Sequence, residues 1–183
     1  MRVVGGKYRS ARLVAPKGLA TRPTTDRTRE SLFNVLCNRM DMEGVQVLDL
    51  FAGSGALGIE SISRGAAFCT FVEDAAHARK AIAENISTLS LGEVTRILRR
   101  DATRLGTPDM PRSIGLVFAD PPYAKGLGER AVKSLSENHW LADEAILVLE
   151  ERKDGLPENL IGFHRVDVRT YGGSAIGLFQ FAG

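Results

Sequence analysis

Short apolar runs alternate with amphipathic segments through most of the chain. The apolar runs predict strands at residues 45–50, 67–73, 94–99, 114–119 and 145–150. The amphipathic segments between them predict helices at residues 56–64, 75–88 and 127–137. Because strands that alternate with helices form parallel sheets covered on both faces, we expect an α/β fold of the Rossmann-like type.

The two ends of the chain follow other patterns. Residues 1–14 carry apolar pairs on either side of a basic, glycine-containing stretch, which predicts a small β-hairpin. Residues 27–40 follow a helical period with one apolar face, and Thr24, Thr25 and Asp26 before them are helix-capping residues. Residues 163–181 predict an antiparallel C-terminal hairpin that turns at a Tyr-Gly-Gly-Ser sequence.

A glycine motif follows the first strand of the alternating region. Gly53, Gly55 and Gly58 have the spacing G-x-G-x-x-G, which allows a tight turn and close approach of a nucleotide cofactor. This spacing alone is equally typical of NAD-dependent oxidoreductases. However, Asp49 stands where a pyrophosphate would be repelled, whereas a ligand with an ammonium and a sulfonium would be attracted. The motif therefore favours S-adenosylmethionine over NAD.

Carboxylates also follow the other predicted strands. Open parallel sheets bind ligands beyond the carboxyl ends of their strands, so Asp49, Glu73, Asp101 and Asp120 are expected at one edge. Glu73 lies about 20 residues after the glycine turn, where an acidic residue accepts ribose hydroxyls. Asp101 can accept from the exocyclic amine of adenine, although the adjacent Arg99-Arg100 pair could instead bind it.

The predicted strand at residues 114–119 ends in the tetrapeptide Asp120-Pro121-Pro122-Tyr123. The prolines fix φ and remove two N–H donors, so the Asp120 carboxylate and the Pro121 carbonyl can present two acceptors at one point. Two acceptors fit the NH₂ group of a nucleobase, with Tyr123 stacked on the ring. Holding both hydrogens directs the nitrogen lone pair toward a methyl donor. We interpret the tetrapeptide as a catalytic motif for methylation of an exocyclic amine.

Composition limits the remaining possibilities. The chain has 183 residues and a net charge of +2, but residues 1–29 hold eight lysines and arginines against one aspartate. We therefore predict an N-terminal basic arm, residues 1–24, that contacts RNA, and one methyltransferase domain, residues 25–183. The arm offers Lys7, Tyr8, Arg9, Arg12, Arg22 and Arg27 as candidate substrate-binding residues, the last of them just beyond its end.

The cysteines and histidines add no chemistry. Carbon-5 pyrimidine methylation requires a cysteine nucleophile, and neither Cys37 nor Cys69 has a suitable sequence context, so both are predicted to be core residues. The spacing of cysteines and histidines indicates no metal site. No apolar run is long enough for a membrane helix or a signal peptide, and we expect a cytoplasmic, monomeric protein.

The whole chain resembles the bacterial 16S rRNA guanine-N2 methyltransferases known as methyltransferase D of the small subunit. The resemblance rests on Gly5-Gly6, the segments at residues 22–34 and 48–60, the Asp120 tetrapeptide and Tyr171-Gly172. It implies a class I methyltransferase with a mostly parallel seven-stranded sheet, S-adenosylmethionine as cofactor, and a guanine N2 of 16S rRNA in the assembled small ribosomal subunit as substrate. It also implies that Phe51 and Ala102 line the cofactor site.

Three other functions remain open at this point. An adenine-N6 methyltransferase acting on rRNA or DNA would use the same tetrapeptide, although the DNA enzymes usually carry a large target-recognition domain. A protein glutamine methyltransferase would leave the basic arm unexplained. A noncatalytic RNA-binding assembly factor would not need an intact glycine motif together with Asp120.

Overall fold

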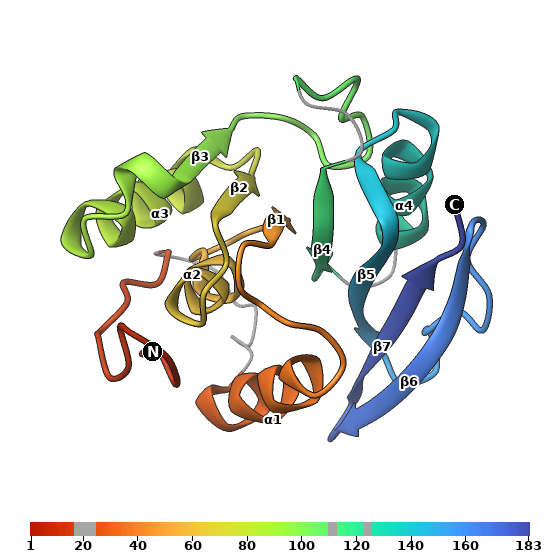
Figure 1. Ribbon diagram of the computed structural model, residues 1–183, viewed down its shortest axis with the longest axis horizontal. Helices are drawn as coiled ribbons and strands as arrows, with labels where there is room; N and C mark the ends of the chain where they lie inside the picture. Colours follow the sequence, from red (N-terminus) through yellow and green to blue (C-terminus); the bar gives the residue numbers. More distant parts are fainter. Residues whose placement is uncertain (17–24, 110–112, 123–125) are drawn as a thin grey trace.

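The computed structural model describes residues 1–16, 25–109, 113–122 and 126–183 and contains a seven-stranded sheet with the order β3-β2-β1-β4-β5-β7-β6 (Figure 1). The strands are β1 (Gln46–Leu50), β2 (Phe68–Val72), β3 (Thr95–Leu98), β4 (Ile114–Ala119), β5 (Leu141–Arg152), β6 (Phe163–Tyr171) and β7 (Ser174–Phe181). The helices are α1 (Asp26–Cys37), α2 (Ala56–Ser63), α3 (Ala76–Thr88), the 3₁₀ turn η1 (Gly92–Val94) and α4 (Leu127–Glu137).

The pairing of the strands confirms the predicted architecture. Strands β1 to β5 pair in parallel, whereas β7 runs antiparallel to both β5 and β6. The C-terminal hairpin therefore extends a parallel sheet, and the seven-stranded sheet that the family resemblance implies is present. Within the described residues, no helix is long and apolar enough to cross a membrane.

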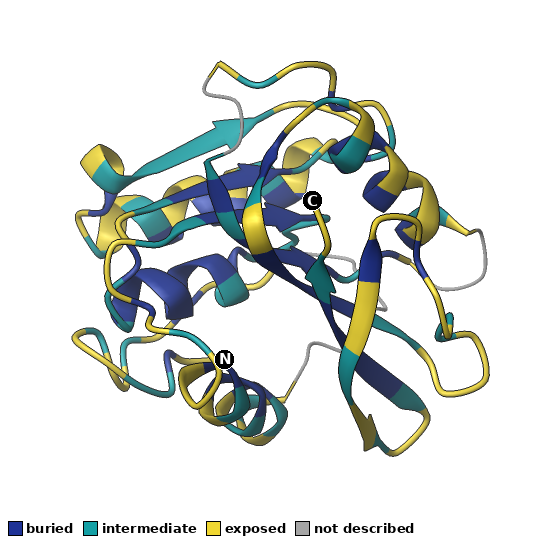
Figure 2. Ribbon diagram, turned by 45° about the vertical axis from the view of Figure 1, so that its right-hand side comes forward, coloured by how far each residue is buried: buried dark blue, intermediate teal, exposed yellow. Residues whose placement is uncertain are grey.

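Helices cover both faces of the sheet unequally. Helices α1, α2 and α3 pack on one face, where Phe33, Ile59 and Ile82 meet strand residues such as Phe118. On the other face α4 contributes Ala131, Val132 and Leu135 to a second apolar cluster. Figure 2 shows the buried strands between these layers. Residues alternate between the faces along each strand, so on β1 the side chain of Asp49 lies on the same face as α2.

The strand register brings the predicted site to one edge. Leu50 pairs with Val72 on one side and with Ala119 on the other, and Ala119 pairs with Leu149. The next residue of each strand therefore stands in one row, formed by Phe51, Glu73, Asp120 and Glu150. The end of the glycine strand and the start of the tetrapeptide are thus neighbours at the carboxyl edge.

Two predicted elements differ from the structure by more than two residues at one end. Strand β5 begins at Leu141 rather than at residue 145, because Leu141 pairs with Ile114 before a register shift. Helix α1 ends at Cys37 rather than at residue 40, because the N–H groups of Arg39 and Met40 both donate to the Leu36 carbonyl in a closing turn. Met40 still packs against the core from that turn.

The N-terminal segment, residues 1–16, forms only a minimal hairpin. Arg2 and Arg12 form a single antiparallel bridge, and the amides of Val3 and Ser10 donate across the hairpin to the carbonyls of Ala11 and Val3. The segment lies beside α2 in Figure 1, and Val3 and Leu13 are buried in the core of that face. The N-terminal segment is therefore packed on the domain and does not extend as a free arm.

Candidate functional site

The glycine loop between β1 and α2 has the backbone that its sequence predicts. Phe51, Gly53 and Gly55 all have positive φ, at 58°, 57° and 76°. The left-handed region explains the glycines at 53 and 55, and a non-glycine residue there is rare enough to mark Phe51 as a constrained position. Gly58 has a different reason: a Cβ on it would lie 2.4 Å from both Cys69 Sγ and Phe71 Cε1, so only glycine lets α2 sit this close to β2.

Asp49 is buried beneath this loop, with an exposed fraction of 2%. The Gly58 amide donates to its Oδ2 at 3.0 Å, so the carboxylate holds the first turn of α2. Burial raises the pKa of Asp49 well above its usual value, and the charges of Asp120 and Glu73 raise it further. No ion pair of Asp49 is found in the described part of the chain. A cationic group at the loop would relieve this repulsion.

Glu73 connects β2 to the glycine loop. Its Oε2 accepts from the Gly53 amide at 2.9 Å and its Oε1 accepts from the Ala75 amide at 2.8 Å. Each carboxylate oxygen keeps a further lone pair. The residue predicted to accept ribose hydroxyls therefore also fixes the loop from the side.

Asp101 lies outside the sheet, on the exposed turn after β3. Its Oδ1 accepts from the hydroxyl and the amide of Thr103, and these hydrogen bonds lower the pKa of Asp101. Arg100, one of the two arginines that could instead bind Asp101, donates to the Leu105 carbonyl. Ala102 is buried in the core of the α4 face, so only its backbone could line a cofactor.

Asp120 stands at the end of β4 beside acidic neighbours. Burial, together with the charges of Glu150 and Glu151, raises the pKa of Asp120 to about 8. Pro121 is buried and Pro122 is exposed. Tyr123 and Arg22, both predicted site residues, lie outside the described residues. Glu150 is the last residue of the predicted strand at residues 145–150 and lies opposite Asp120. It was not among the predicted site residues, although it is a carboxylate at the end of a predicted strand like the others.

The predicted substrate-binding residues divide into two groups. The Lys7 and Tyr8 amides bond to the Ser63 carbonyl and hydroxyl at 2.7 and 2.9 Å, which places the hairpin tip at the end of α2 away from the glycine loop. Tyr8 is half-buried and Lys7 Nζ lies 5.3 Å from its ring centroid. Arg12 is exposed near the other end of the segment, where Met1 Sδ accepts from the Ser54 hydroxyl, and Arg27 is exposed on α1. Arg9 is exposed at the tip.

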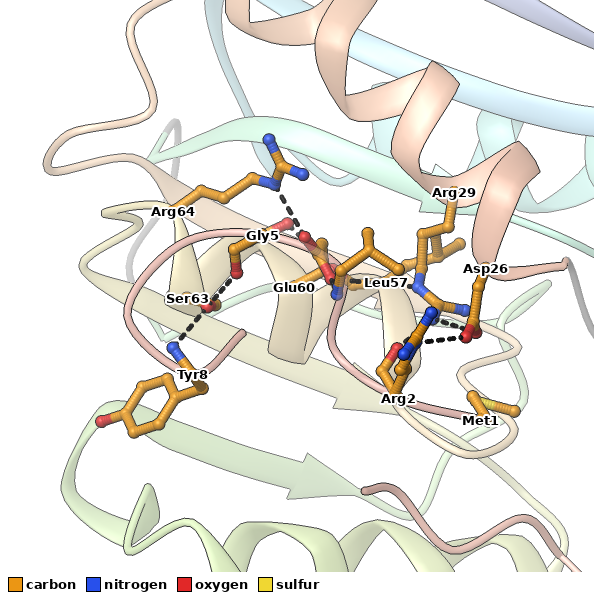
Figure 3. A network of polar contacts seen from close by, with 12 residues as sticks. Met1, Arg2, Gly5, Tyr8, Asp26, Arg29, Leu57, Glu60, Ser63 and Arg64 are labelled. Atoms are coloured by element: carbon orange, nitrogen blue, oxygen red, sulfur yellow. Dashed lines mark hydrogen bonds and ion pairs between the residues drawn. The ribbon is translucent and has the colours of Figure 1, made fainter. Parts of the chain in front are cut away.

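A buried ion network anchors the N-terminal segment, and only part of it could be anticipated from local sequence (Figure 3). Glu60, fully buried on α2, accepts from Arg64 Nε and from the Val4 amide, both at 2.8 Å. Arg29 Nε lies 3.9 Å from Glu60, and Arg29 donates to Asp26 at 2.9 Å and to the Arg2 carbonyl. The segment that begins with the predicted helix-capping residues thus contributes Asp26 and Arg29 to a structural network.

The charges around the glycine loop suit a cationic cofactor. The unbalanced carboxylates beneath the loop fit a cationic ligand, and a Cβ built on Gly53 would meet nothing closer than the Phe51 carbonyl at 3.8 Å, which leaves space above the turn. No group of three or more histidine, cysteine or acidic side chains is placed to hold a metal ion in the part of the chain described. Of the two cysteines, Cys69 is buried as predicted, but Cys37 is exposed at the end of α1, so its assignment to the core was wrong.

Comparison with known proteins identifies relatives of the whole chain. Residues 1–180 match the family model described as "Conserved hypothetical protein 95". The "Ribosomal RNA small subunit methyltransferase D" of Escherichia coli K12 is 40% identical over 158 residues, covering 86% of this chain and 78% of that protein. The Bacillus subtilis protein named "Putative rRNA methyltransferase YlbH" is 35% identical, with full coverage of both chains. The solved structure of "Putative methyltransferase yhhF" from E. coli has a TM-score of 0.84 and 38% identity, covering 99% of this chain and 97% of that one.

Proposed function

The chain belongs to the small subunit methyltransferase D family, described by the conserved hypothetical protein 95 model, and from this premise we propose that it is an S-adenosylmethionine-dependent rRNA methyltransferase. More specifically, we propose transfer of a methyl group to the N2 amine of one guanine of 16S rRNA, with the assembled small subunit as substrate. The observation that most supports this proposal is the placement of Asp120 in the same row as the end of the glycine strand.

The cofactor site would be formed by the glycine loop and the carboxylates around it. The backbone of Gly53 and Gly55, together with Phe51, would contact the nucleoside, Glu73 would accept its ribose hydroxyls, and Asp101 and Ala102 would border the adenine. Asp49 would favour the cationic amino-acid end through its charge, from its buried position behind Gly58. When bound, S-adenosylmethionine supplies an electrophilic methyl group.

Asp120 and the Pro121 carbonyl would each accept one N–H of the guanine amine. The nitrogen would then be pyramidal, and its lone pair would form the new N–C bond as the methyl–sulfur bond breaks and its electrons stay on sulfur. The methylated nitrogen must lose a proton. Asp120 is suited to take it, because a carboxylate with a pKa of about 8 is a stronger base than an ordinary aspartate. Pro122 would keep the turn rigid, and Tyr123 would stack on the base.

The RNA would extend past the site along the N-terminal segment. Arg12 would contact phosphates near the glycine loop, Lys7, Tyr8 and Arg9 would contact RNA further from the target base, and Arg22 and Arg27 would contact phosphates as well. Helix α2 has eight residues, so its two ends, which carry the glycine loop and the contacts of the hairpin tip, are about 12 Å, or two nucleotides or more, apart. A folded RNA surface could span that distance, which agrees with a small subunit as substrate.

The test is to map the methyl group. Small subunits from a strain lacking this gene are incubated with the protein and isotopically labelled S-adenosylmethionine, and the rRNA is digested for mass spectrometry. We expect label on the N2 of a single guanosine in 16S rRNA. Label on an adenosine N6 would contradict the guanine assignment, and absence of label from all rRNA would contradict the proposed function. Naked 16S rRNA, assayed in parallel, should be a much poorer substrate.

A further inference from the structure

Asn85 on α3 bonds to two segments that are far apart in the sequence. Its side chain is almost fully buried, with 1% exposed. Its Nδ2 donates to the Val14 carbonyl and to the Ser54 carbonyl, both at 3.0 Å, and its Oδ1 accepts from the Val14 amide at 2.7 Å. Both N–H donors of the amide are therefore used, one on each segment.

The two segments belong to different parts of the proposed site. Ser54 stands between Gly53 and Gly55, so its carbonyl orientation fixes a peptide plane of the glycine loop. Val14 is two residues after Arg12, and both of its backbone polar groups are held by Asn85. The loop that would bind the cofactor and the segment that would bind RNA are thus joined through one side chain.

Within the described residues, no other hydrogen bond joins the N-terminal segment to the backbone of the glycine loop. Gly5, Lys7 and Tyr8 bond to Ser63 at the far end of α2, and Val4 bonds to Glu60. Met1 reaches the Ser54 hydroxyl only through a sulfur contact of 3.4 Å, and a thioether is a weak acceptor. Asn85 is therefore the described side chain that hydrogen-bonds to the backbone of both segments.

We propose that Asn85 is a positioning residue that couples binding of the cofactor at the glycine loop to binding of RNA at the N-terminal segment. The inference rests on the proposed function, since it assigns these two ligands to the two segments. When RNA holds Arg12, it restricts the backbone at Val14, and Asn85 restricts the Ser54 carbonyl with it. By linkage, the cofactor must strengthen RNA binding by the same factor.

The test measures this factor as a ratio of affinities. Labelled S-adenosylhomocysteine is bound to the full chain by equilibrium dialysis, with and without saturating small subunits from the deletion strain. We expect the subunits to tighten binding about 5-fold or more in the natural protein. In Asn85→Ala the ratio should fall to about 1. Asn85→Asp keeps the acceptor for the Val14 amide but loses both donors, so it should also lose most of the ratio.

A control and a ligand-free readout separate coupling from general loosening. Ser134→Ala removes another buried polar group, one that accepts from the Leu105 amide on the opposite face at 3.0 Å, and it should leave the ratio unchanged. Hydrogen exchange of the Val14 amide should become faster in Asn85→Ala without any ligand, because its acceptor is gone. If Asn85→Ala does not fold, Asn85→Asp decides the question.

The outcomes separate a failure of the coupling from a failure of the proposed function. If the natural protein fails to bind S-adenosylhomocysteine, the proposed function is wrong and the coupling is wrong with it. If it binds but added small subunits leave the affinity unchanged, the coupling alone is overturned. An Asn85→Asp variant that keeps the full ratio would also overturn it.

Discussion

At the carboxyl edge of the sheet, carboxylates lie beside one another, whereas in the N-terminal network each buried or half-buried carboxylate lies against arginines. Burial and acidic neighbours raise the pKa values of Asp49 and Asp120. In the network, burial also raises the pKa of Asp26, but the hydrogen bond and charge of Arg29 more than offset this, so its pKa is lowered. Glu60 contacts Arg29 and Arg64. The contrast indicates that the network's carboxylates are paired with arginines of the protein, whereas the carboxyls at the edge have raised pKa values and a cationic ligand would favour their ionised form.

The largest effect should come from removing the acceptor at the edge. Asp120→Ala should lower kcat/KM for methyl transfer by about 10³-fold or more, because loss of a positioned acceptor in the site costs several kcal/mol in the transition state. The affinity for S-adenosylhomocysteine should change by less than about 3-fold. The exposed Asp154, which pairs with Arg152, provides a control variant, Asp154→Ala, with normal turnover. Full turnover in Asp120→Ala would contradict the assigned role.

The next effect tests the network by removing its central carboxylate. Glu60→Ala should destabilise the protein by about 3–5 kcal/mol in urea unfolding, because a buried ion network would lose one of its partners. Asp154→Ala breaks an exposed pair and should cost less than about 1 kcal/mol. A loss for Glu60→Ala as small as that of the control would show that the network does not anchor the segment.

The pH profile of methyl transfer tests the titration of Asp120 at the carboxyl edge. Since the pKa of Asp120 is about 8 and its ionised form is needed as acceptor and base, kcat/KM should rise about tenfold per pH unit below 8 and level off above it. Asp120→Asn keeps an oxygen acceptor but cannot titrate or take a proton. This variant should be slower and should lack the limb near pH 8. A limb that persists in Asp120→Asn would assign it to another group.

Stability should depend on pH in opposite ways in the two regions. The folded-state pKa of Asp120 lies above the unfolded value of about 4, so the folded protein binds more protons and loses stability as pH rises from about 4 to 8. Asp120→Asn should remove at least about 1 kcal/mol of that loss. Asp26, with its lowered pKa, stabilises the fold above its unfolded pKa of about 4, and this contribution is lost as pH falls further. Thermal melting of Asp120→Asn and Asp26→Asn from pH 3 to pH 9 should separate these windows.

The smallest effect should come from the exposed cations outside both regions. Arg9→Ala combined with Arg12→Ala should weaken binding to the small subunit and reduce the slope of log affinity against log salt by about 1–2. The exposed Lys80 on α3, changed to Ala, provides a single-charge control. A slope that is unchanged by the double substitution would exclude these arginines from phosphate contact.

The parallel core and the row of residues at its carboxyl edge could be predicted because their sequences have strict local requirements. The strand at Ile114–Ala119 and the helix at Leu127–Glu137 have the predicted bounds, since the strand is an uninterrupted apolar run and the helix follows one helical period. The glycine motif predicts a turn with positive φ, and Gly53 and Gly55 have positive φ in the structure. Long-range pairing could not be predicted in the same way: Glu60 and Arg29 are 31 residues apart, and nothing local indicates that their charges meet. Asn85 likewise gives no local sign of its partners, because Val14 and Ser54 are 71 and 31 residues away from it in the sequence.

The central claim is that the carboxyl edge places a methyl donor next to the acceptors for a nucleobase amine. A crystal structure of the protein with bound S-adenosylhomocysteine measures this most directly. We predict the adenosine between the glycine loop and Glu73, with the sulfur facing Asp120 so that a methyl group and a bound amine could approach within about 3.5 Å. A ligand bound elsewhere, or a sulfur directed away from Asp120, would contradict the account.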